Sequence, residues 1–593
     1  MNPTLFITKK IAEAIESLYG VTPADGMIQI QATRKEFEGD ITLVVFPLLK
    51  MSRKTPDKSA EEIGEWLKHN TDAVSTYNVI KGFLNLKFAS SFWFDILKGV
   101  AQCDNFGQLP PTGKTIMVEF SSPNTNKPLH LGHIRNNLLG WSVSQLLSAN
   151  GHNVVKVNLV NDRGIHICKS MLAWLRKGNG ETPATSGKKG DHLVGDYYVE
   201  FNNMLTAEVN RIMEEKGIDK DEAEKQAPLL KEAQEMLLKW EQGDKDVVNL
   251  WKTMNGWVYD GFDITYRNLG IKFDKTYYES NTYLLGKSLV LDGLARGIFE
   301  KHEDGSVWCD LTADGLDQKL LLRSDGTSVY MTQDLGTANQ RYDEYKFDEH
   351  IYVVGNEQNY HFQVLKLILK KLGFNWSDAI YHLSYGMVEL PEGKMKSREG
   401  TVVDADDLLE RMYNTAKETS LELGKIENLT EDEQHKLFRM ISLGALKYFI
   451  IKVDPKKTML FDPKESIDFN GNTGPFIQYT HARIKSILRK AAEQGYTPSL
   501  TGAELVPKEE AIIQLVSSYP DKVKEAGDAH SPALIANYAY ELAKEFNQYY
   551  HDISILREEN VAIRDQRLVL IDVIAKVLSK AMSILGIELP ERM

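Results

Sequence analysis

The chain has 593 residues, which is too long for one hydrophobic core and predicts three or four domains. Its composition, 42% hydrophobic and 26% charged, is that of an ordinary soluble globular protein. A net charge of −13 argues against a general nucleic-acid coat protein, although local basic patches would still allow a specific RNA partner.

The cysteines and the apolar runs indicate the cellular compartment of the protein and whether it binds zinc. The three cysteines lie far apart without a CxxC pair, which predicts a reducing cytoplasm and no protein-bound zinc. The first residues lack the apolar core of a signal peptide. The longest apolar run, near 443–453, contains two lysines and is too short to span a bilayer. We therefore expect a cytoplasmic protein without a membrane segment.

Residues 1–105 predict a small α/β accessory domain with no cluster of catalytic side chains. A strand is expected over 41–49, and strand-like alternation recurs over 77–88. Between them, Ser59 followed three residues later by Glu62 predicts a capped helix.

A strand, a polar loop and a helix follow one another from residue 115 onwards. Residues 115–120 (TIMVEF) are apolar and β-branched, as in a buried strand, and the serines, asparagines and prolines of 121–129 predict a loop. From Leu131 the apolar residues recur at helical spacing. This is half of a βαβ unit, so a ligand is expected at the carboxyl end of the strand, facing the helix N-terminus.

Two histidines stand three apart at the start of this predicted helix. The spacing of His130 and His133 puts both imidazoles on one side, and Gly132 between them leaves room for a flat base or ribose. Imidazole N–H groups can donate to a phosphate whose charge grows in a transition state. The alternative is that both histidines only cap the helix.

The segment after this unit continues the α/β pattern and then changes character. A second strand, 154–160, ends in polar residues that would again lie in the ligand crevice. From about 176 to 300 the chain is charged and amphipathic, which predicts a helical insertion with solvated outer faces. A third strand over 350–354 and a fourth over 381–390 return to the core.

A carboxylate near residue 330 is a candidate for binding a guanidinium group. We predict a turn at 324–327, a strand over 329–331, and a helix beginning near Thr332. Tyr330 and Asp334 are four residues apart and share a face if the helix begins there. A carboxylate matches the guanidinium fork with two charge-assisted hydrogen bonds. The alternative is an Asp that caps the helix.

A cationic loop follows the fourth strand. It is flanked by glycines and carries Lys394, Lys396 and Arg398. Such a loop can neutralise a triphosphate while pyrophosphate leaves, or it can be a solvated basic turn.

The remainder of the chain, from Asp404 to Met593, is almost wholly helical in pattern. Its most distinctive stretch, 466–490, interleaves aromatic and basic residues behind a tight GNTGP loop. This pattern suits stacking on unpaired bases and binding of phosphates. A core helix with a basic outer face would produce the same pattern.

These motifs together resemble one family. The stretch SSPNTNKPLHLGH resembles the HIGH signature of class I aminoacyl-tRNA synthetases, in the long form of arginyl-tRNA synthetases. SDGTSVYMTQDLG, the GNTGPFIQYTHAR stretch, the terminal LGIELPERM and the pattern of the first hundred residues resemble the same family. Lys394-Met395 fits the first two positions of the KMSKS loop, but Ser397 stands where a second lysine is usual. The family reading gives that lysine's task to Lys127.

The resemblance implies a split Rossmann-type α/β fold with a parallel sheet, an N-terminal α/β domain and a C-terminal α-helical bundle. Four domains are expected. Residues 1–105 would contact the tRNA elbow, and residues 111–405 would be catalytic and carry the insertion 176–300. Residues 406–465 would form connecting helices, and residues 466–593 would bind the anticodon.

The reaction implied is ATP-dependent ligation of L-arginine to the 3′ end of tRNA(Arg), with Mg²⁺ accompanying ATP, by a cytoplasmic monomer. The catalytic residues implied are His130, His133, Lys127, Lys394 and Lys396. ATP would contact Ser122, Pro123, Asn124, Lys127, His130, Gly132, His133, Met387, Val388 and Ser397. Arginine would contact Glu119, Ser122, Asn124, His133, Tyr330, Asp334 and Gln358. The tRNA would contact Phe469, Asn472, Gly474, Tyr479 and Arg483.

Two other interpretations remain open at this point. One is a class I synthetase for another amino acid, such as cysteine or glutamate, although the lack of a Cys/His zinc set speaks against cysteine. The other is a tRNA-binding paralogue with a dead site, against which the intact His130, Gly132, His133 and Asp334 speak. A structural scaffold would leave these clustered polar loops unexplained.

Overall fold

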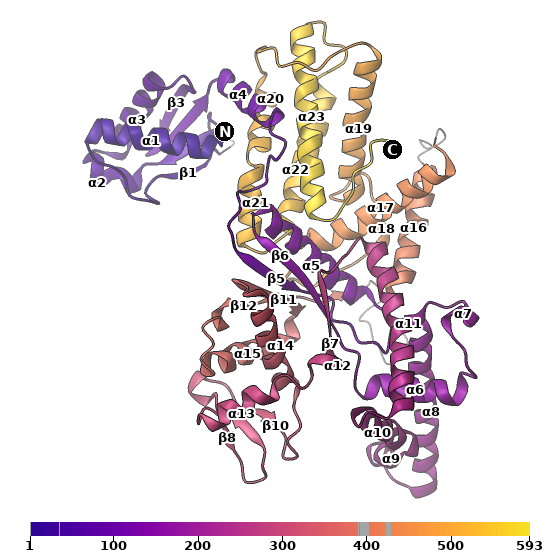
Figure 1. The fold of residues 1–593 in the computed structure, drawn as a ribbon. Coiled ribbons are helices and arrows are strands. Elements are labelled where there is room, and N and C mark those ends of the chain that lie inside the picture. Colours follow the sequence, from indigo (N-terminus) through magenta and orange to yellow (C-terminus); the bar gives the residue numbers. More distant parts are fainter. Residues whose placement is uncertain (1, 35, 390, 392–402, 423–428) are drawn as a thin grey trace.

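The computed structural model describes residues 2–34, 36–389, 391, 403–422 and 429–593. At its centre lies a five-stranded parallel sheet with the strand order β12-β11-β5-β6-β7 (Figure 1). The strands and their helices are β5 (Thr115–Glu119), α5 (Leu131–Ala149), β6 (Asn153–Val160), α6 (Ile165–Lys177), β7 (Lys275–Tyr278), β11 (Glu349–Gly355), α15 (Asn359–Lys371) and β12 (Ile380–Tyr385). The chain adds strands first on one side of β5 and then on the other, so the order reverses between β5 and β11.

The two faces of this sheet pack into different cores. On β5, Ile116 and Val118 join a core shared with α5 and the C-terminal helices, whereas Met117 joins a second core shared with α14 (Tyr330–Tyr345) and α15. A parallel strand covered on both faces is apolar along its whole length, because alternate side chains enter opposite cores. The strand predicted from the run TIMVEF is thereby confirmed.

The range 176–300, expected as one helical insertion, is interrupted by a strand of the central sheet. Residues 275–278 form β7, which pairs parallel with β6 from Val157↔Lys275 to Val160↔Tyr278. The helices before it are α7 (Pro183–Ser186), α8 (Gly190–Lys216), α9 (Lys220–Gln226), α10 (Pro228–Glu241) and α11 (Lys245–Leu269). After it come α12 (Glu279–Thr282), α13 (Lys287–Ala295) and an antiparallel sheet of β8 (Glu300–Lys301), β9 (Val307–Cys309) and β10 (Lys319–Leu322). The uniform insertion is therefore wrong, because a four-residue strand is too short to show a period in the sequence.

The first hundred residues form an α/β unit on an antiparallel sheet of order β1-β2-β4-β3. Its elements are α1 (Pro3–Tyr19), β1 (Gln29–Ala32), β2 (Ile41–Val44), α2 (Leu49–Ser52), α3 (Pro56–Asn70), β3 (Val74–Ile80), β4 (Phe83–Phe88) and α4 (Ser90–Ala101). The predicted cap at Ser59 is wrong. Helix α3 begins at Pro56 with Thr55 as its N-cap, and the buried Ser59 hydroxyl donates to the Thr55 carbonyl. A proline at the first helical position favours this earlier start.

Helices make up nearly all of the C-terminal part that the structure describes. They are α16 (Ala405–Glu422), α17 (Glu431–Ile451), α18 (Pro463–Ser466), α19 (Gly474–Glu493), α20 (Pro507–Ser517), α21 (Tyr519–Asp528), α22 (Ala533–Asp552) and α23 (Val561–Ile584). The short strands β13 (Val388–Glu389) and β14 (Met459–Leu460) pair in parallel beside them. Among the described residues, no helix is both long and apolar enough to cross a bilayer.

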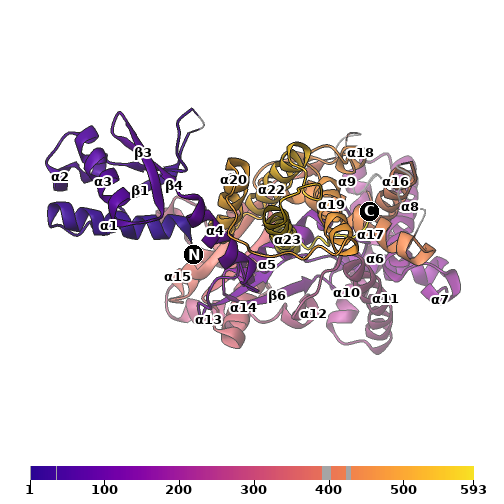
Figure 2. The ribbon, with the colours of Figure 1, turned by 90° about the horizontal axis from the view of Figure 1, so that it is seen from above.

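The N-terminal unit projects beside α20 in both views of the molecule (Figures 1 and 2). The Lys87 ammonium bridges the two parts, with its Nζ 2.9 Å from Asp40 and 3.1 Å from Glu510 of α20. At the end of α1, the Asn2 amide donates to Asp521 of α21 at 2.7 Å. These polar contacts fix where the N-terminal unit sits on the helical bundle.

Candidate active site

The reversal of strand order places a crevice at the carboxyl ends of β5 and β11. The loop after β5 and the start of α5 form one wall, and the segment after β11 forms the other. In open α/β sheets, ligands bind at this place because both loops turn away from the sheet. The helix N-terminus adds unpaired N–H groups and a positive dipole end, which suit phosphate.

The two histidines at the start of α5 cap the helix and lie with their ring centroids 4.0 Å apart. His130 Nδ1 accepts the Gly132 N–H at 3.1 Å, and His133 Nδ1 accepts the His130 N–H at 3.2 Å. A neutral imidazole whose Nδ1 is an acceptor carries its proton on Nε2. Capping, the alternative weighed from the sequence, therefore also fixes the tautomer, and it leaves each histidine with an Nε2–H donor.

Both imidazoles are neutral at physiological pH. Burial, together with the nearby Lys127 ammonium, lowers the pKa of His130 to about 4. The pKa of His133 lies well below its ordinary value, first because of burial and then because of His130 and Lys127. Burial also lowers the pKa of Lys127. The pair can therefore act as fixed hydrogen-bond donors, while Lys127 supplies the nearby positive charge.

The backbone immediately after β5 is held in an unusual conformation. Ser121 and Ser122 both have positive φ, 79° and 45°, which costs free energy for residues other than glycine. Asn136 of α5 accepts the Ser121 N–H at 2.6 Å, and Asn158 of β6 accepts the Ser122 N–H at 3.0 Å. These two asparagines thereby stabilise the turn that presents the predicted Ser122-Pro123-Asn124 contacts. Their role was missed from the sequence, because amides in a helix and a strand carry no distinctive signal.

The helix bearing Tyr330 and Asp334 begins earlier than expected. The strand predicted over 329–331 is wrong, because β10 ends at Leu322, Gly326 turns the chain with a φ of 77°, and Tyr330 starts α14. Val329 is the N-cap, so the alternative role of Asp334 as a helix cap is also wrong. Tyr330 and Asp334 share a face of α14, as predicted, because they lie four residues apart in one helix.

The carboxylate of Asp334 reaches across to the next helix. Its Oδ2 lies 2.6 Å from Nε2 of His361 in the first turn of α15. Tyr330 is 76% exposed, and Gln358 is exposed in the short 3₁₀ helix that precedes α15. The other carboxylate oxygen of Asp334 remains available to bind a ligand. The Tyr330 side chain lies outside the core and can cover a bound ligand.

A second carboxylate, Glu279, points into the same region and was missed from the sequence. It follows β7 directly, and burial raises its pKa to about 7, with Arg163 opposing and Asp162 and Asp334 adding to the rise. The negative charge of Asp334 is thus among the causes that raise the pKa of Glu279. The signal existed: Tyr277-Tyr278 is a short apolar pair ended by polar Glu279-Ser280, the same pattern that marked the ends of the other strands.

Glu119, expected to contact arginine, already has partners in this structure. Its side chain is buried, its Oε2 forms an ion pair with the fully buried Arg341 of α14, and its Oε1 accepts the Ser122 hydroxyl at 3.2 Å. The Arg341 guanidinium also lies over the ring of Tyr277, 4.8 Å from its centroid. This buried pair links β5, which ends at Glu119, to β7, which precedes Glu279, and to α14, which carries Tyr330 and Asp334.

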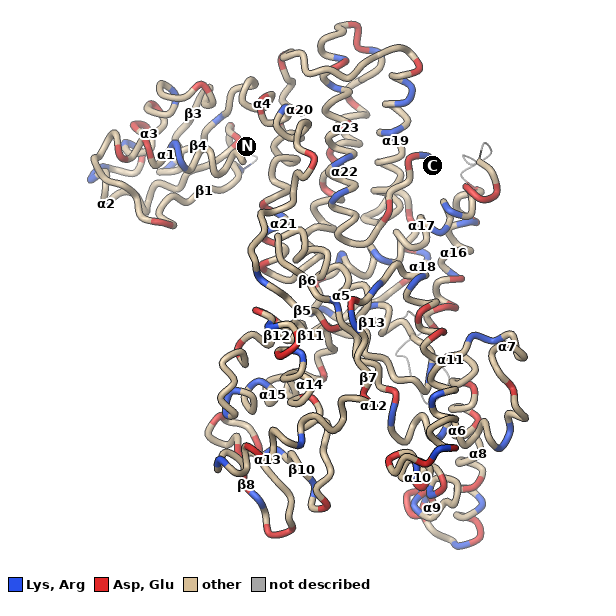
Figure 3. The backbone as a smooth tube through the Cα atoms, in the orientation of Figure 1, with Lys and Arg blue, Asp and Glu red and all other residues tan. Residues whose placement is uncertain are grey.

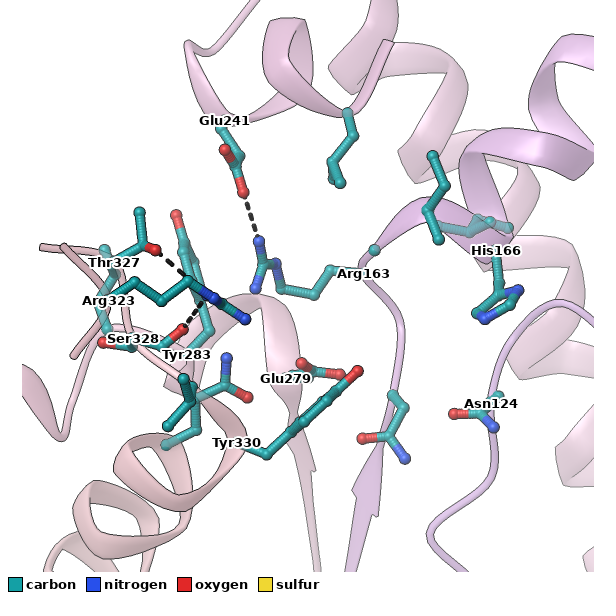
Figure 4. Close-up of a pocket in the computed structure, with 18 of the residues that line it drawn as sticks. Asn124, Arg163, His166, Glu241, Glu279, Tyr283, Arg323, Thr327, Ser328 and Tyr330 are labelled. Carbon is teal, nitrogen blue, oxygen red and sulfur yellow. Dashed lines mark hydrogen bonds and ion pairs between the residues drawn. The ribbon is translucent and has the colours of Figure 1, made fainter. Parts of the chain in front are cut away.

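A cavity of about 880 Å³, within the usual size range of ligand pockets, is lined by Glu279 and by the predicted residues Asn124 and Tyr330, whereas Asp334 and the two histidines do not line it. Figure 4 shows Asn124, Glu279 and Tyr330 around it, with Arg163 reaching across to Glu241. The Arg163 guanidinium lies 2.6 Å from the Glu241 carboxylate and 4.1 Å from the centroid of the Tyr283 ring. The cavity is thus lined by carboxylates and by Arg163, whose guanidinium stacks on Tyr283 and is already paired with Glu241.

The predicted contacts that follow the fourth strand are described only in part. Lys394, Lys396, Ser397 and Arg398 lie outside the described residues. Of the pair before them, Met387 is 45% exposed and Val388 is buried in β13.

Of the predicted RNA contacts, Gly474 is buried and the other four are partly buried. The Arg483 guanidinium lies over the rings of Tyr479 and Tyr550, 4.8 Å and 5.6 Å from their centroids, and Phe469 packs edge-on against Tyr479. Lys and Arg recur along α19 (Figure 3). Gly474 is buried, and a Cβ there would lie 2.3 Å from the Gly444 carbonyl oxygen, so close packing requires a glycine at this position, and its contact with RNA stays a prediction.

Two further members of the same stretch have internal partners. Asn472 accepts the Tyr448 hydroxyl at 2.6 Å, and its carbonyl accepts Lys452. His481 is buried, with Nδ1 2.9 Å from the Pro590 carbonyl oxygen. The interleaved aromatic and basic residues are therefore partly a core helix, as the alternative held, with an outer face around Arg483.

One group of side chains has the composition of a metal site. The ligand atoms of Asp191, His192 and Asp406 lie within 4.8 Å of one another. The Lys189 ammonium, however, lies 3.0 Å from Asp191 and 2.5 Å from Asp406, in the place a cation would take. These residues therefore form an ion-pair network between the insertion and the start of α16.

Comparison with known proteins agrees with this fold. Residues 100–462 match the family model described as tRNA synthetases class I (R), catalytic domain. Residues 5–88 match the arginyl tRNA synthetase N terminal domain, and residues 477–593 match the DALR anticodon binding domain. The fold and the histidine-bearing helix start are thus those of a class I aminoacyl-tRNA synthetase.

Full-length relatives identify the specificity group. The arginine–tRNA ligases of Bacteroides thetaiotaomicron and Parabacteroides distasonis are 61% and 60% identical to the chain, with 99% of each chain covered. The solved Thermus thermophilus arginyl-tRNA synthetase superposes with a TM-score of 0.79 at 25% identity, covering 99% of this chain and 100% of the other. The chain belongs to the arginyl-tRNA synthetase family.

Proposed function

We propose that this protein activates L-arginine with ATP and transfers it to the 3′ end of tRNA(Arg). In the first step the arginine carboxylate attacks the α-phosphate, a new C–O–P linkage forms, and pyrophosphate leaves. In the second step a hydroxyl of the terminal ribose attacks the arginyl carbonyl, an ester forms, and AMP leaves. Because the substrate supplies its own nucleophile, the protein contributes positioning and charge stabilisation.

The observations that carry this proposal are the carboxylates of Glu279 and Asp334, which influence one another electrostatically, and the two neutral histidines at the start of α5. Two carboxylates can pair with both edges of a guanidinium, which lysine or citrulline cannot match. The Nε2–H groups of His130 and His133 suit the oxygens of the α-phosphate, where negative charge develops. Neutral donors stabilise that charge without a preformed ion pair to ATP.

The remaining assignments are also proposals. Lys127, with Lys394 and Lys396, would neutralise the phosphates, and magnesium would arrive with ATP. Ser122, Pro123, Gly132, Met387, Val388 and Ser397 would contact ATP. Glu119 and Asn124 would help to hold the α-amino and guanidinium ends of arginine. Ser122, His133, Tyr330 and Gln358 would also contact arginine. Tyr479, Arg483, Phe469 and Asn472 would lie near the tRNA.

We further propose a cytoplasmic monomer with four functional parts. Residues 1–105 would contact the tRNA elbow, 111–405 would carry out catalysis, 406–465 would connect, and 466–593 would bind the anticodon. The interleaved rings and guanidinium of the α19 face support RNA binding by stacking.

The first experiment is arginine-dependent exchange of pyrophosphate into ATP, with and without total tRNA. We expect exchange with arginine and none with lysine or citrulline at the same concentration. Exchange that appears only with tRNA would mean that tRNA completes the site, and exchange without it would remove that coupling. No exchange with arginine under either condition would contradict the proposed function, and a panel of the other amino acids would then identify the substrate or a dead site.

Arginine binding should depend on pH through Glu279. Its free-enzyme pKa of about 7 means that the carboxylate is mostly protonated at pH 6 and mostly ionised at pH 8. Because a cationic side chain binds the ionised form, the KM for arginine should fall about tenfold from pH 6 to pH 8. Steady-state exchange at saturating ATP measures this profile.

Glu279→Gln provides the control for this pH profile. It should raise the KM for arginine at pH 8 and flatten the profile, because the carboxyl group whose ionisation would favour binding of the guanidinium is then absent. A wild-type KM that is constant over this range would contradict the role of Glu279.

A further inference from the structure

Arg135, in the second turn of α5, is a buried cation that is held by backbone carbonyls alone. Its side chain is 2% exposed, and no carboxylate among the described residues lies within 4 Å of it. The guanidinium donates to the carbonyl oxygens of Met387 at 2.7 Å, Lys457 at 2.7 Å and Pro455 at 3.1 Å. Its carbon lies 5.9 Å from the centroid of the Tyr385 ring. A buried charge is costly unless it is fully hydrogen-bonded, so these three bonds must persist for it to be tolerated.

The three carbonyls belong to two chain segments that pair with one another. Met387 precedes β13 and Pro455 precedes β14. Two of the carbonyls accept a backbone N–H as well: Met459 N–H donates to Met387 at 3.0 Å, and Gly386 N–H donates to Pro455 at 2.9 Å. Arg135 thus lies beside the paired strands β13 and β14 and joins the segments that precede these strands to α5.

A second attachment joins α5 to the segment that follows residue 402. The Leu131 N–H donates to the Val403 carbonyl at 3.1 Å, and the Ala405 N–H donates to the Leu129 carbonyl at 2.9 Å. An antiparallel bridge pairs His130 with Asp404 between them. The described segments on both sides of residues 392–402 are therefore tied to residues 129–135, the start of the helix that carries both histidines.

The hydrogen bonds of Arg135 do more than fill space in the core. A buried arginine can often be replaced by an apolar side chain of similar volume at little cost when only packing is involved. Here the guanidinium fork selects three carbonyls on two strands, which an apolar side chain cannot hold. What Arg135 adds is a fixed distance between the first turns of α5 and the strand pair.

We propose that Arg135 is a positioning residue for adenylate formation, which sets the place of the His130–His133 turn relative to β13, β14 and residues 403–405. This inference rests on the proposed function. Displacement of a catalytic group by about 1 Å can cost on the order of 10²-fold in rate, so losing this anchor should slow the chemical step rather than weaken binding. Arg135 itself touches neither substrate.

The test compares Arg135→Met and Arg135→Lys with the wild type in arginine-dependent pyrophosphate exchange. Arg135→Met should lower kcat at least tenfold while the KM values for arginine and ATP change less than threefold. Arg135→Lys keeps the charge and part of the hydrogen bonding, so its kcat should lie between the two. Hydrogen exchange should show lost protection at the amides of Gly386 and Met459 in Arg135→Met.

Arg567→Met is the matched control. Arg567 is also a buried arginine, 8% exposed and paired with Glu509 at 2.7 Å, but it lies in α23 of the C-terminal bundle. We expect it to lower stability and leave kcat and the two amides unchanged. An equal loss of kcat in both variants, or a folded Arg135→Met with wild-type kcat, would overturn the proposal.

A failure of the proposed function is distinguishable from a failure of this inference. The wild type alone reports on arginine-dependent exchange, whereas the hydrogen-exchange comparison needs no substrate. If Arg135→Met does not fold, Arg135→Lys decides: a wild-type kcat together with lost amide protection would contradict a positioning role. A lower kcat with unchanged KM values would support it.

Discussion

Replacing Asp334 with asparagine should lower kcat/KM for arginine by roughly 30- to 140-fold while leaving the KM for ATP nearly unchanged. The loss corresponds to about 2–3 kcal/mol, the lower part of the range for truncating one partner of a hydrogen-bonded charge pair. We take the lower part because the Asp334 side chain is 37% exposed in the free protein, so water screens part of its charge. The amide can still bond to His361, so the local geometry should survive. Steady-state exchange with varied arginine measures the effect.

Asp343→Asn is the control for this experiment. Asp343 lies on the same helix, but it is exposed, and its partners are the surface residues Lys346, at 2.8 Å, and Asn339, whose amide donates at 3.2 Å. Its replacement should leave both KM values unaltered. If Asp334→Asn retains the wild-type KM for arginine, Asp334 does not bind the guanidinium, and Glu279 alone would have to carry the specificity.

Replacing His133 with alanine should lower the rate of arginine activation by about 10²- to 10³-fold. The expected size is that of removing one preorganised donor from a developing negative charge, about 3–4 kcal/mol. The KM for ATP should change little, because the Nε2–H contact strengthens only as the α-phosphate gains charge. Single-turnover formation of arginyl-adenylate would measure the step directly.

The cap that His133 provides must be separated from its chemical role. His133→Ala also exposes the His130 N–H, which costs about 1 kcal/mol of stability. Thr430→Ala removes a comparable capping box at the start of α17, away from the crevice, and should lower stability by a similar amount without changing the rate. If the His133 variant turns over at the wild-type rate, the transition-state role of this donor is wrong.

Patterns within a single element were readable from the sequence. The apolar run of β5, the spacing of His130 and His133 and the four-residue spacing of Tyr330 and Asp334 depend on one strand or one helix, whose periods are written in the chain. The family resemblance came from the same local stretches. Helix starts were less accurate, because Pro56 and Tyr330 begin their helices several residues before the expected positions.

Features that join distant elements could not be read in this way. Glu279 enters the site only because β7 pairs with β6, and Arg341 reaches Glu119 from 222 residues away. Arg135 was indistinguishable from a surface residue until the carbonyls around it were known. A buried polar residue is defined by its partners, and those are a property of the tertiary fold.

The position of β5 has a consequence for how the protein is made. Its neighbour β11 begins at Glu349, 230 residues after β5 ends at Glu119. At roughly 5–20 residues per second, a ribosome needs roughly 10–45 s to supply that second neighbour. During this interval one edge of the nascent sheet has no strand to pair with, and exposed edges invite pairing with other chains. The growing chain therefore passes through a stage that depends on chaperones or on prompt completion of synthesis.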